Sequence, residues 1–172
     1  MRATITFILL IFTFSNSIAL EASSKSNNYL YTEPGCNFFV EFPDKPKINK
    51  HYVVDSDSEF NQANYSTEDS SFMRAECLPI ERDLVTPEYL IEVAALQSKN
   101  DGLMHVEISH KKEAFFDTIE LRGYKEIVGL KFTYQYFIYL GENSLLMLYA
   151  GALSQVYPTE SIVKFRNSVR LK

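Results

Sequence analysis

Two side chains of one predicted strand have a spacing that suits metal binding. His105 and Glu107 are two residues apart, so in a strand over residues 103–110 both should point to the same side. A protein zinc site usually has three or four ligands. Two ligands are too few, and exposed strand faces often carry such pairs, so the sequence predicts no metal site.

The two cysteines, Cys36 and Cys77, are the candidates for chemistry at sulfur. A catalytic cysteine needs an activating histidine, and no motif ties a histidine to either of them. In an exported protein, a single pair of cysteines favours a disulfide over free thiols. Both lie on the apolar face of their predicted strands, which permits the bond and leaves free thiols as the alternative.

The sequence carries none of the common motifs of catalysis or cofactor binding. Its glycines are scattered and form no phosphate-binding loop, and no nucleophile elbow is present. Glu81 and Asp83 follow a predicted strand, where exposed carboxylates are ordinary. We therefore expect a protein without catalytic residues and without a cofactor.

The first nineteen residues resemble a secretory signal peptide. Arg2 provides a positive start, residues 5–14 are apolar, and Ser17-Ile18-Ala19 is a small-x-small cleavage site. The apolar run is about half of the ~20 residues that cross a bilayer, which argues against a membrane anchor. We expect a signal peptide over residues 1–19, a flexible leader over 20–28 and a single domain over 29–172, exported to the periplasm or the extracellular space.

The charge of the chain limits its partners. Its formal net charge is −5, whereas nucleic acids and anionic lipids attract basic faces. No later stretch is apolar enough to span a membrane, because the most apolar region is interrupted by Lys131, Gln135 and Glu142. The sequence predicts no nucleic-acid partner and no stable membrane insertion once the signal peptide is removed. Asn64-Tyr65-Ser66 is a glycosylation sequon, relevant only in a eukaryote.

The domain should be built mainly from short strands joined by turns. Alternating apolar residues and turn residues predict strands over residues 36–43, 51–54, 60–66, 72–78, 103–110 and 113–121. Thr86 as N-cap and Pro87 at the first position predict a helix over 87–100, with Leu90, Val93, Ala94 and Leu96 as its buried stripe. A closing helix should follow Tyr157-Pro158-Thr159 and bury Ile162, Phe165 and Val169.

The most apolar stretch, residues 131–153, predicts a central β-hairpin around the turn Gly141–Asn143. A two-residue turn at its start pairs Ile138 with Leu145, and a three-residue turn pairs Ile138 with Leu146. Both registers leave one strongly apolar face and one mixed face on the first strand. The mixed face carries Thr133, Gln135, Phe137 and Tyr139. If a covering helix leaves part of it open, these residues form an aromatic surface for a protein or peptide partner.

The order of the predicted elements defines the fold class. Strands that follow one another through short turns form antiparallel sheets, and the two helices should pack on that sheet. The sequence therefore predicts an α+β domain with an antiparallel sheet of about six to eight strands flanked by helices.

Two short segments resemble a known group of secreted bacterial domains. Phe39-Val40-Glu41-Phe42-Pro43-Asp44-Lys45-Pro46 is similar to the opening of domains with the PsbP-like (Mog-type) fold, and Phe165-Arg166-Asn167-Ser168-Val169 resembles their closing helix. The resemblance implies an αβα sandwich around an antiparallel sheet. Members of such families are typically accessory or binding proteins and share no catalytic motif, so the resemblance assigns no functional residue.

These observations favour an exported, non-catalytic binding or accessory protein that acts through a protein or peptide partner. The alternative is a secreted effector or a periplasmic inhibitor of the immunity-protein type. A hydrolytic enzyme ranks third and would require a cluster of catalytic residues in one cleft.

Overall fold

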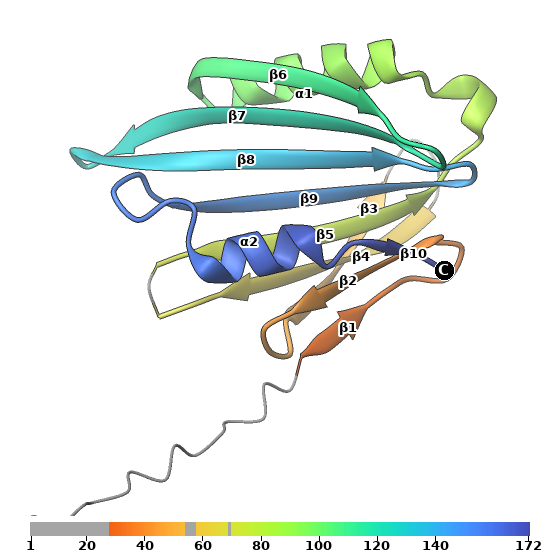
Figure 1. Cartoon of the computed structure of the whole chain (residues 1–172), viewed down its shortest axis with the longest axis horizontal. Helices are drawn as coiled ribbons and strands as arrows, with labels where there is room; N and C mark the ends of the chain where they lie inside the picture. The colour runs from red at the N-terminus through yellow and green to blue at the C-terminus, as the bar shows by residue number, and fades with distance from the viewer. Residues whose placement is uncertain (1–27, 54–57, 69) are drawn as a thin grey trace, which may run out of the picture.

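The computed structural model of the chain describes residues 28–53, 58–68 and 70–172 (Figure 1). The predicted signal peptide and nearly all of the predicted leader lie outside these residues. The strands are β1 (Tyr29–Tyr31), β2 (Phe38–Phe42), β3 (Lys47–Val53), β4 (Ser58–Ser66), β5 (Phe72–Pro79), β6 (Met104–Lys112), β7 (Asp117–Ile127), β8 (Leu130–Leu140), β9 (Ser144–Leu153) and β10 (Arg170–Leu171). The helices are α1 (Pro87–Asn100), α2 (Glu160–Asn167) and a short 3-10 turn at Arg82–Leu84.

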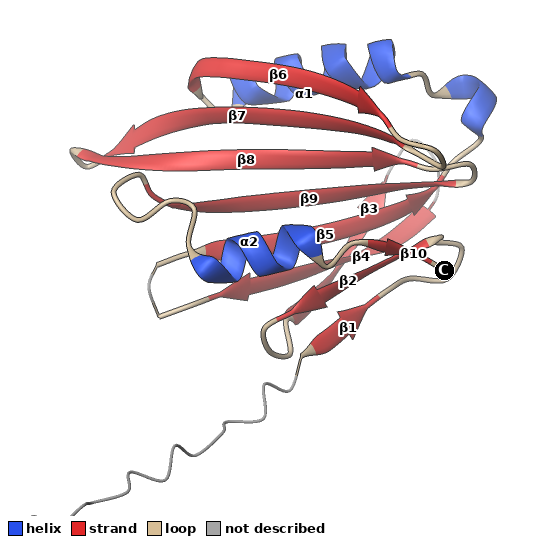
Figure 2. Cartoon of the chain, in the orientation of Figure 1, coloured by secondary structure: helices blue, strands red, loops and turns tan. Residues whose placement is uncertain are grey.

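The strands form two antiparallel sheets. The large sheet has seven strands in the order β3-β4-β5-β9-β8-β7-β6, and the small one has three in the order β1-β2-β10. Helix α1 lies on one face of the large sheet, whereas α2 and the small sheet lie on the other (Figure 2). The predicted fold class, an antiparallel sheet of about six to eight strands flanked by helices, is confirmed.

The central hairpin exists, but both predicted registers are wrong. Ile138 pairs with Met147, because the two-residue turn is Glu142–Asn143 and Gly141 still belongs to the paired part of the hairpin. The backbone N–H of Gly141 donates to the carbonyl of Ser144 at 2.9 Å. A β-carbon at Gly141 would lie 3.1 Å from the ring of Phe38, so the glycine serves this close approach and not the turn.

Helix α1 begins and ends where the sequence predicts. The Thr86 side chain accepts a hydrogen bond from the Tyr89 N–H at 3.2 Å, and Gly102 follows the helix with a φ of +69°, which glycine adopts without strain. The predicted buried stripe is only partly right. Leu90, Ala94 and Ser98 are buried, whereas Val93 and Leu96 are exposed, because the helix rests on a narrow strip of the sheet.

Helix α2 closes the opposite face of the sheet. The Thr159 hydroxyl accepts from the Ile162 N–H, and Ile162 and Phe165 are buried as predicted. Phe165 packs against Phe42 of β2 with ring centroids 4.8 Å apart. Val169 follows the helix and only partly joins this core, because the helix ends at Asn167.

Several strand limits differ from the predicted ones. The short strands β1 and β10 escaped prediction because two or three residues carry too little periodicity to recognise. Strand β3 is longer than the predicted 51–54, and β7 runs from Asp117 to Ile127 in place of 113–121. Gly123 lies inside β7 and pairs with Tyr134 of β8.

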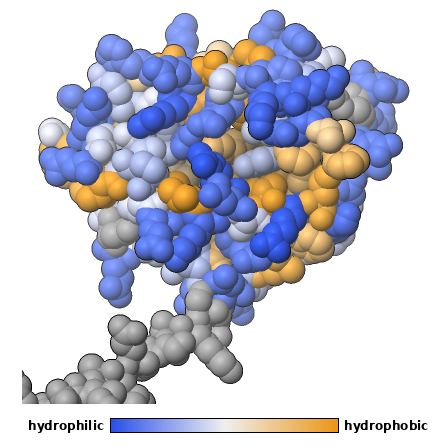
Figure 3. Space-filling model, in the orientation of Figure 1, coloured by the Kyte–Doolittle hydropathy of each residue, from blue (hydrophilic) through white to orange (hydrophobic). Residues whose placement is uncertain are grey.

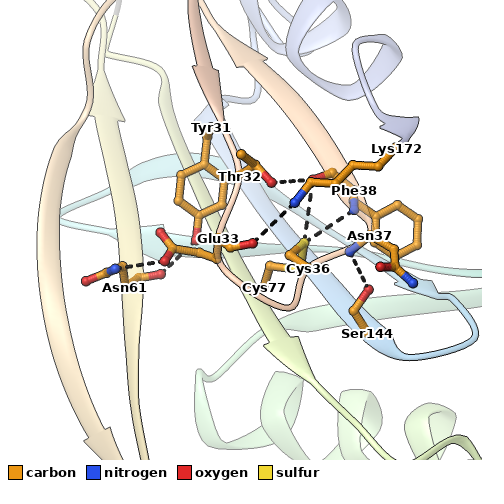
Figure 4. The surroundings of a disulfide bond; sticks show 10 residues. All are labelled: Tyr31, Thr32, Glu33, Cys36, Asn37, Phe38, Asn61, Cys77, Ser144 and Lys172. Atoms are coloured by element: carbon orange, nitrogen blue, oxygen red, sulfur yellow. Dashed lines mark hydrogen bonds between the residues drawn. A yellow bond between two sulfur atoms is a disulfide. The ribbon is translucent and has the colours of Figure 1, made fainter.

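The predicted disulfide between Cys36 and Cys77 is confirmed. The two Cα atoms are 5.9 Å apart, and the bond joins the segment before β2 to strand β5, tying the small sheet to the large one (Figure 4). Hydrogen bonds around it fix the same junction. The Tyr31 hydroxyl donates to the carbonyl of Asn61 at 2.8 Å, and the Asn37 N–H donates to the Ser144 hydroxyl at 2.9 Å.

Two apolar cores lie on the two faces of the large sheet. The first lies under α2 and the small sheet and includes the disulfide, and the second lies under α1 around Leu90, Ile119 and Leu140. In the described part of the chain, no helix combines the length and apolar character needed to cross a membrane.

Candidate binding site

The large sheet is covered by α1 on one face and by α2 on the other, and the two helices lie over different strands. Helix α1 contacts β6 and β7, whereas α2 contacts β5 and β9 on the other side. Seven strands span roughly 29 Å at about 4.8 Å per strand, and a helix with its side chains is about 10–12 Å wide. One helix therefore cannot cover a whole face. On the α1 face a part stays uncovered, whereas on the other face the small sheet adds to the cover that α2 gives.

On the α1 face, the uncovered part forms a cleft of about 360 Å³ beside the end of the helix. We call it the tyrosine cleft. Its walls are the aromatic residues Phe72, Tyr134, Tyr136 and Tyr149 and the polar residues Arg74, Gln97, Asp101 and Lys125. The aromatic residues come from β5, β8 and β9, so the rigid centre of the sheet positions them.

The four rings form two adjacent pairs. Tyr136 and Tyr149 meet edge to face at 4.8 Å, and Phe72 lies 5.5 Å from Tyr134. Gly151, directly opposite Tyr134 on β9, makes the second pair possible. A β-carbon there would collide with the Phe72 ring, so only glycine lets this ring lie across the strand.

Asp101, the C-cap of α1, anchors the cleft to the helix. Its carboxylate accepts hydrogen bonds from the Tyr136 hydroxyl at 2.6 Å and from the Gln97 amide at 3.0 Å. Its backbone carbonyl accepts from the Lys125 ammonium at 2.9 Å. The Tyr136 ring is thereby held in one orientation before any ligand arrives.

The charged groups on the β5 side of the cleft are paired with one another. The Arg74 guanidinium donates to the Asn64 carbonyl oxygen at 3.0 Å, lies 4.0 Å from the Glu76 carboxylate and stacks 5.5 Å from the centre of the Tyr149 ring. Glu76 also accepts a hydrogen bond from Gln62. Because the positive and negative charges are balanced within the protein, the cleft favours a ligand that is itself uncharged.

The buried phenols of the cleft predict a loss of stability in alkali. Burial, together with Asp101, raises the pKa of Tyr136 above its usual 10.0, and burial raises the pKa of Tyr149. The unfolded chain, with ordinary tyrosines near pH 10, loses these protons first. Stability from these residues is therefore complete below about pH 10 and declines as the pH rises further.

Thermal unfolding across this alkaline range, in the native protein and in Tyr136→Phe, measures the effect. The melting temperature of the native protein should fall more steeply than that of the variant. Equal slopes, or phenolate absorbance that rises for every tyrosine at the ordinary pH, would contradict the prediction.

The opposite face carries a second hollow, which we call the α2 groove. It measures about 380 Å³ and lies between α2 and the strands β6 and β7. It includes Phe137 and Tyr139, with Phe116, Lys111, Glu120 and Arg166 around them. Figure 3 shows this side of the molecule, where hydrophobic side chains are recessed between hydrophilic ones.

The residues predicted to form an aromatic partner surface share one strand face, but all four are buried. Phe137 is 1% exposed and Tyr139 is 7% exposed, and both belong to the core under α2 and the small sheet. The Arg166 guanidinium lies 5.7 Å from the centre of the Phe137 ring. The expected open aromatic surface is thus a groove with a buried floor, and partner binding there stays a prediction.

Thr133 and Gln135, the polar members of the predicted surface, are engaged within the protein. The Thr133 hydroxyl hydrogen-bonds the Ser154 hydroxyl at 2.8 Å. The Gln135 amide donates to the Glu120 carboxylate and accepts from the Tyr157 hydroxyl. These side chains hold β8 to β7 and to the loop before α2.

His105 and His110 line neither hollow. His105 stacks on Tyr124 with ring centroids 5.1 Å apart, and a register shift between Met104 and Glu107 breaks the alternation on which the predicted His105–Glu107 pair depended. His110 lies 2.9 Å from the Asp117 carboxylate. In the described residues no group of three or more histidine, cysteine or acidic side chains is arranged to hold a metal ion.

The sequence analysis missed the tyrosine cleft, although a signal was present. Tyr134 and Tyr136 alternate on the face of the hairpin that was assigned to the core, and Tyr149 follows on the next strand. Tyrosine hydroxyls need polar partners when they are buried, so three tyrosines on one face indicate a face that is only half covered.

No family model matches the chain, and no curated protein matches it. Among solved structures it is similar to LpqN of Mycobacterium tuberculosis, which is involved in cell envelope biogenesis. The identity is 16% over 84% of this chain and 90% of LpqN, with a TM-score of 0.52. A protein of Bacteroides thetaiotaomicron shares 12% identity over 83% of this chain and 48% of its own length, with a TM-score of 0.51.

At these identities the likeness shows a shared fold and nothing further. The chain is thus an α+β domain that shares its fold with a protein involved in cell envelope biogenesis. The resemblance to PsbP-like domains stays a prediction, since neither of these comparisons bears on it.

Proposed function

We propose that the protein is an exported accessory protein of the cell envelope that binds an extended segment of a partner protein and catalyses no reaction. The observation that carries the proposal is the tyrosine cleft, an uncovered part of a rigid sheet lined by four aromatic rings. Tyrosine and phenylalanine rings offer large contact areas at low cost in side-chain entropy. The disulfide and the likeness to an envelope protein are compatible with export.

The ligand that best fits the cleft is an uncharged, extended segment rich in proline. Aromatic-lined grooves recognise the polyproline II conformation, which loses little entropy on binding. Tyr136 and Tyr134 stand two residues apart on β8, so their rings are repeated along the strand. The Tyr134 hydroxyl can donate a hydrogen bond to a peptide carbonyl, whereas the Tyr136 hydroxyl donates to Asp101 and offers its oxygen as an acceptor for a peptide N–H.

A phage-displayed library of random peptides, selected on the purified protein, tests the proposal. We expect enrichment of proline-containing peptides, with the selected peptide bound at least tenfold more weakly by Tyr149→Ala, as for aromatic residues that dominate an interface. Tyr149→Phe should retain binding because it keeps the ring. Tyr89→Ala, at an exposed tyrosine in the first turn of α1, is the matched control and should bind within about twofold of the native protein.

Failure to enrich any peptide would overturn the proposed function. Equal binding by a folded Tyr149→Ala protein would leave peptide binding standing and move it away from the tyrosine cleft. The α2 groove would then be the surface to test, as the sequence predicted.

A further inference from the structure

The turn between β7 and β8 has an unfavourable backbone conformation, and its Val128 side chain is almost fully exposed to solvent. Val128 has a φ of +50° and Gly129 a φ of +76°, so both central residues of this two-residue turn are left-handed, as in a type I′ turn. Glycine and asparagine adopt this conformation readily, whereas a β-branched residue does so rarely. The Val128 side chain is nevertheless 97% exposed, so no packing within the domain offsets the strain.

The turn is the centre of an apolar patch, which we call the apolar tip. Among the described residues twelve large apolar side chains are exposed, and five lie at this end of the sheet. They are Met104, Ile127, Val128, Leu130 and Val156. Ile127 faces Leu130 across the hairpin, and the Ser154 N–H, two residues before Val156, donates to the carbonyl of Lys131 at 2.8 Å. Met104, at the start of β6, pairs with Tyr124 further from the turn.

The apolar tip is a projection with basic side chains behind it. The hairpin extends beyond the neighbouring strands (Figure 1), and a β-carbon at Gly129 would meet no atom within 4 Å. Lys131 lies beside the turn, with its ammonium 3.6 Å from the centre of the Tyr124 ring, whereas the Lys125 ammonium is bound by the carbonyl of Asp101. Apolar side chains at the end of the hairpin, followed along its strands by a lysine and a tyrosine, suit the interface of a lipid bilayer.

We propose that the apolar tip inserts reversibly into the surface of a membrane. A convex apolar projection can enter a bilayer directly, whereas a protein partner would need a matching pocket. Lys131 can attract anionic headgroups, while Glu126 opposite it across the hairpin and the overall negative charge of the protein keep the attraction local and weak. The contact goes beyond the proposed peptide binding, does not depend on it, and involves no helix that spans the membrane.

Co-sedimentation of the protein with lipid vesicles tests the inference, using phosphatidylcholine alone and phosphatidylcholine mixed with phosphatidylglycerol. We expect binding to both, stronger with phosphatidylglycerol. Val128→Asn should lower the partition coefficient about tenfold on both, as expected when one aliphatic side chain no longer inserts. Lys131→Gln should lower it about fivefold, and only on vesicles that contain phosphatidylglycerol.

Val128→Asn also separates function from folding. Asn-Gly is the preferred pair in a type I′ turn, so this variant should melt at a higher temperature than the native protein while binding vesicles less. Leu130→Gln is a second variant that should lose binding in the same way. Phe115→Asn, at an exposed phenylalanine in the turn at the opposite end of the sheet, is the matched control and should bind like the native protein.

Three results would overturn the inference. They are a native protein that binds neither type of vesicle, a Val128→Asn variant that binds as well as the native protein, and a Phe115→Asn variant that loses binding equally. The first would leave a protein pocket as the alternative partner for the apolar tip.

Discussion

Replacing both cysteines with alanine should lower the free energy of unfolding by about 4 kcal/mol, through the loss of a cross-link that closes a long loop. Cys36 and Cys77 are 41 residues apart in sequence, and their bond restricts the unfolded chain far more than the folded one. Small domains are typically stable by only 5–15 kcal/mol, so the loss would be a large fraction of the total. Alanine is the better replacement, because it introduces no polar group at these buried positions.

Denaturant unfolding of the oxidised protein and the double variant measures this difference. Reduced native protein is the internal control and should unfold close to the double variant. A difference below about 1 kcal/mol would contradict the prediction, and would mean that the two sheets hold together without the bond.

The disulfide and the two helices could be predicted because local chemistry specifies them. In an exported chain, a single pair of cysteines can form only one internal disulfide. The start of each helix is marked by short-range signals, which are Thr86 with Pro87 for α1 and Thr159 with the first turn for α2. The long hairpins could be recognised from alternation alone. These features depend on residues close together in sequence, or on a pairing without competitors.

The hairpin register was wrong because it depends on a contact distant in sequence. Glycine is a common turn residue, yet Gly141 is paired, and the Phe38 ring, about a hundred positions earlier, leaves little room for a β-carbon there. A shift of the turn by one residue moves the cross-strand pairing by two, so each side chain keeps its face and changes its partner. The register with a two-residue turn therefore placed the side chains on their correct faces, whereas the register with a three-residue turn, which differs from the observed pairing by one, would place those of β9 on the wrong face.

The candidate site was missed because the sequence does not show how far a helix reaches across a sheet. Alternation assigned Tyr134 and Tyr136 to a core face. Helix α1 does cover that face over β6, β7 and the Ile138–Leu145 end of the central hairpin, but it leaves the part around Tyr134 open. The mixed face with Phe137 was expected to be the open one, and α2 and the small sheet cover most of it. Strands β1 and β10, which help to close that side, are too short to be recognised in the sequence.

Replacing Phe137 with alanine should destabilise the protein by roughly 3–5 kcal/mol, the usual effect of removing a fully buried phenylalanine. The ring is 1% exposed and lies in the core under α2, and the Arg166 guanidinium lies over it at 5.7 Å from its centre. The strands on both sides are paired along their whole length, so the sheet cannot collapse to fill the space. The same deletion at Phe115, which is 79% exposed, is the matched control and should change stability by less than about 0.5 kcal/mol.

The result for Phe137→Ala also decides between two roles for this strand face. If Phe137 supports the core, unfolding moves to lower denaturant and any loss of partner capture follows from the lost stability. If it belongs to an interface, the variant melts close to the native protein and captures its partner less well. Tyr139→Phe separates the two roles further, since it keeps the ring against Phe38 and Phe116 and removes only the hydroxyl. Native stability with weakened peptide binding in this variant would locate the partner surface in the α2 groove, whereas unchanged binding would favour the tyrosine cleft on the other face.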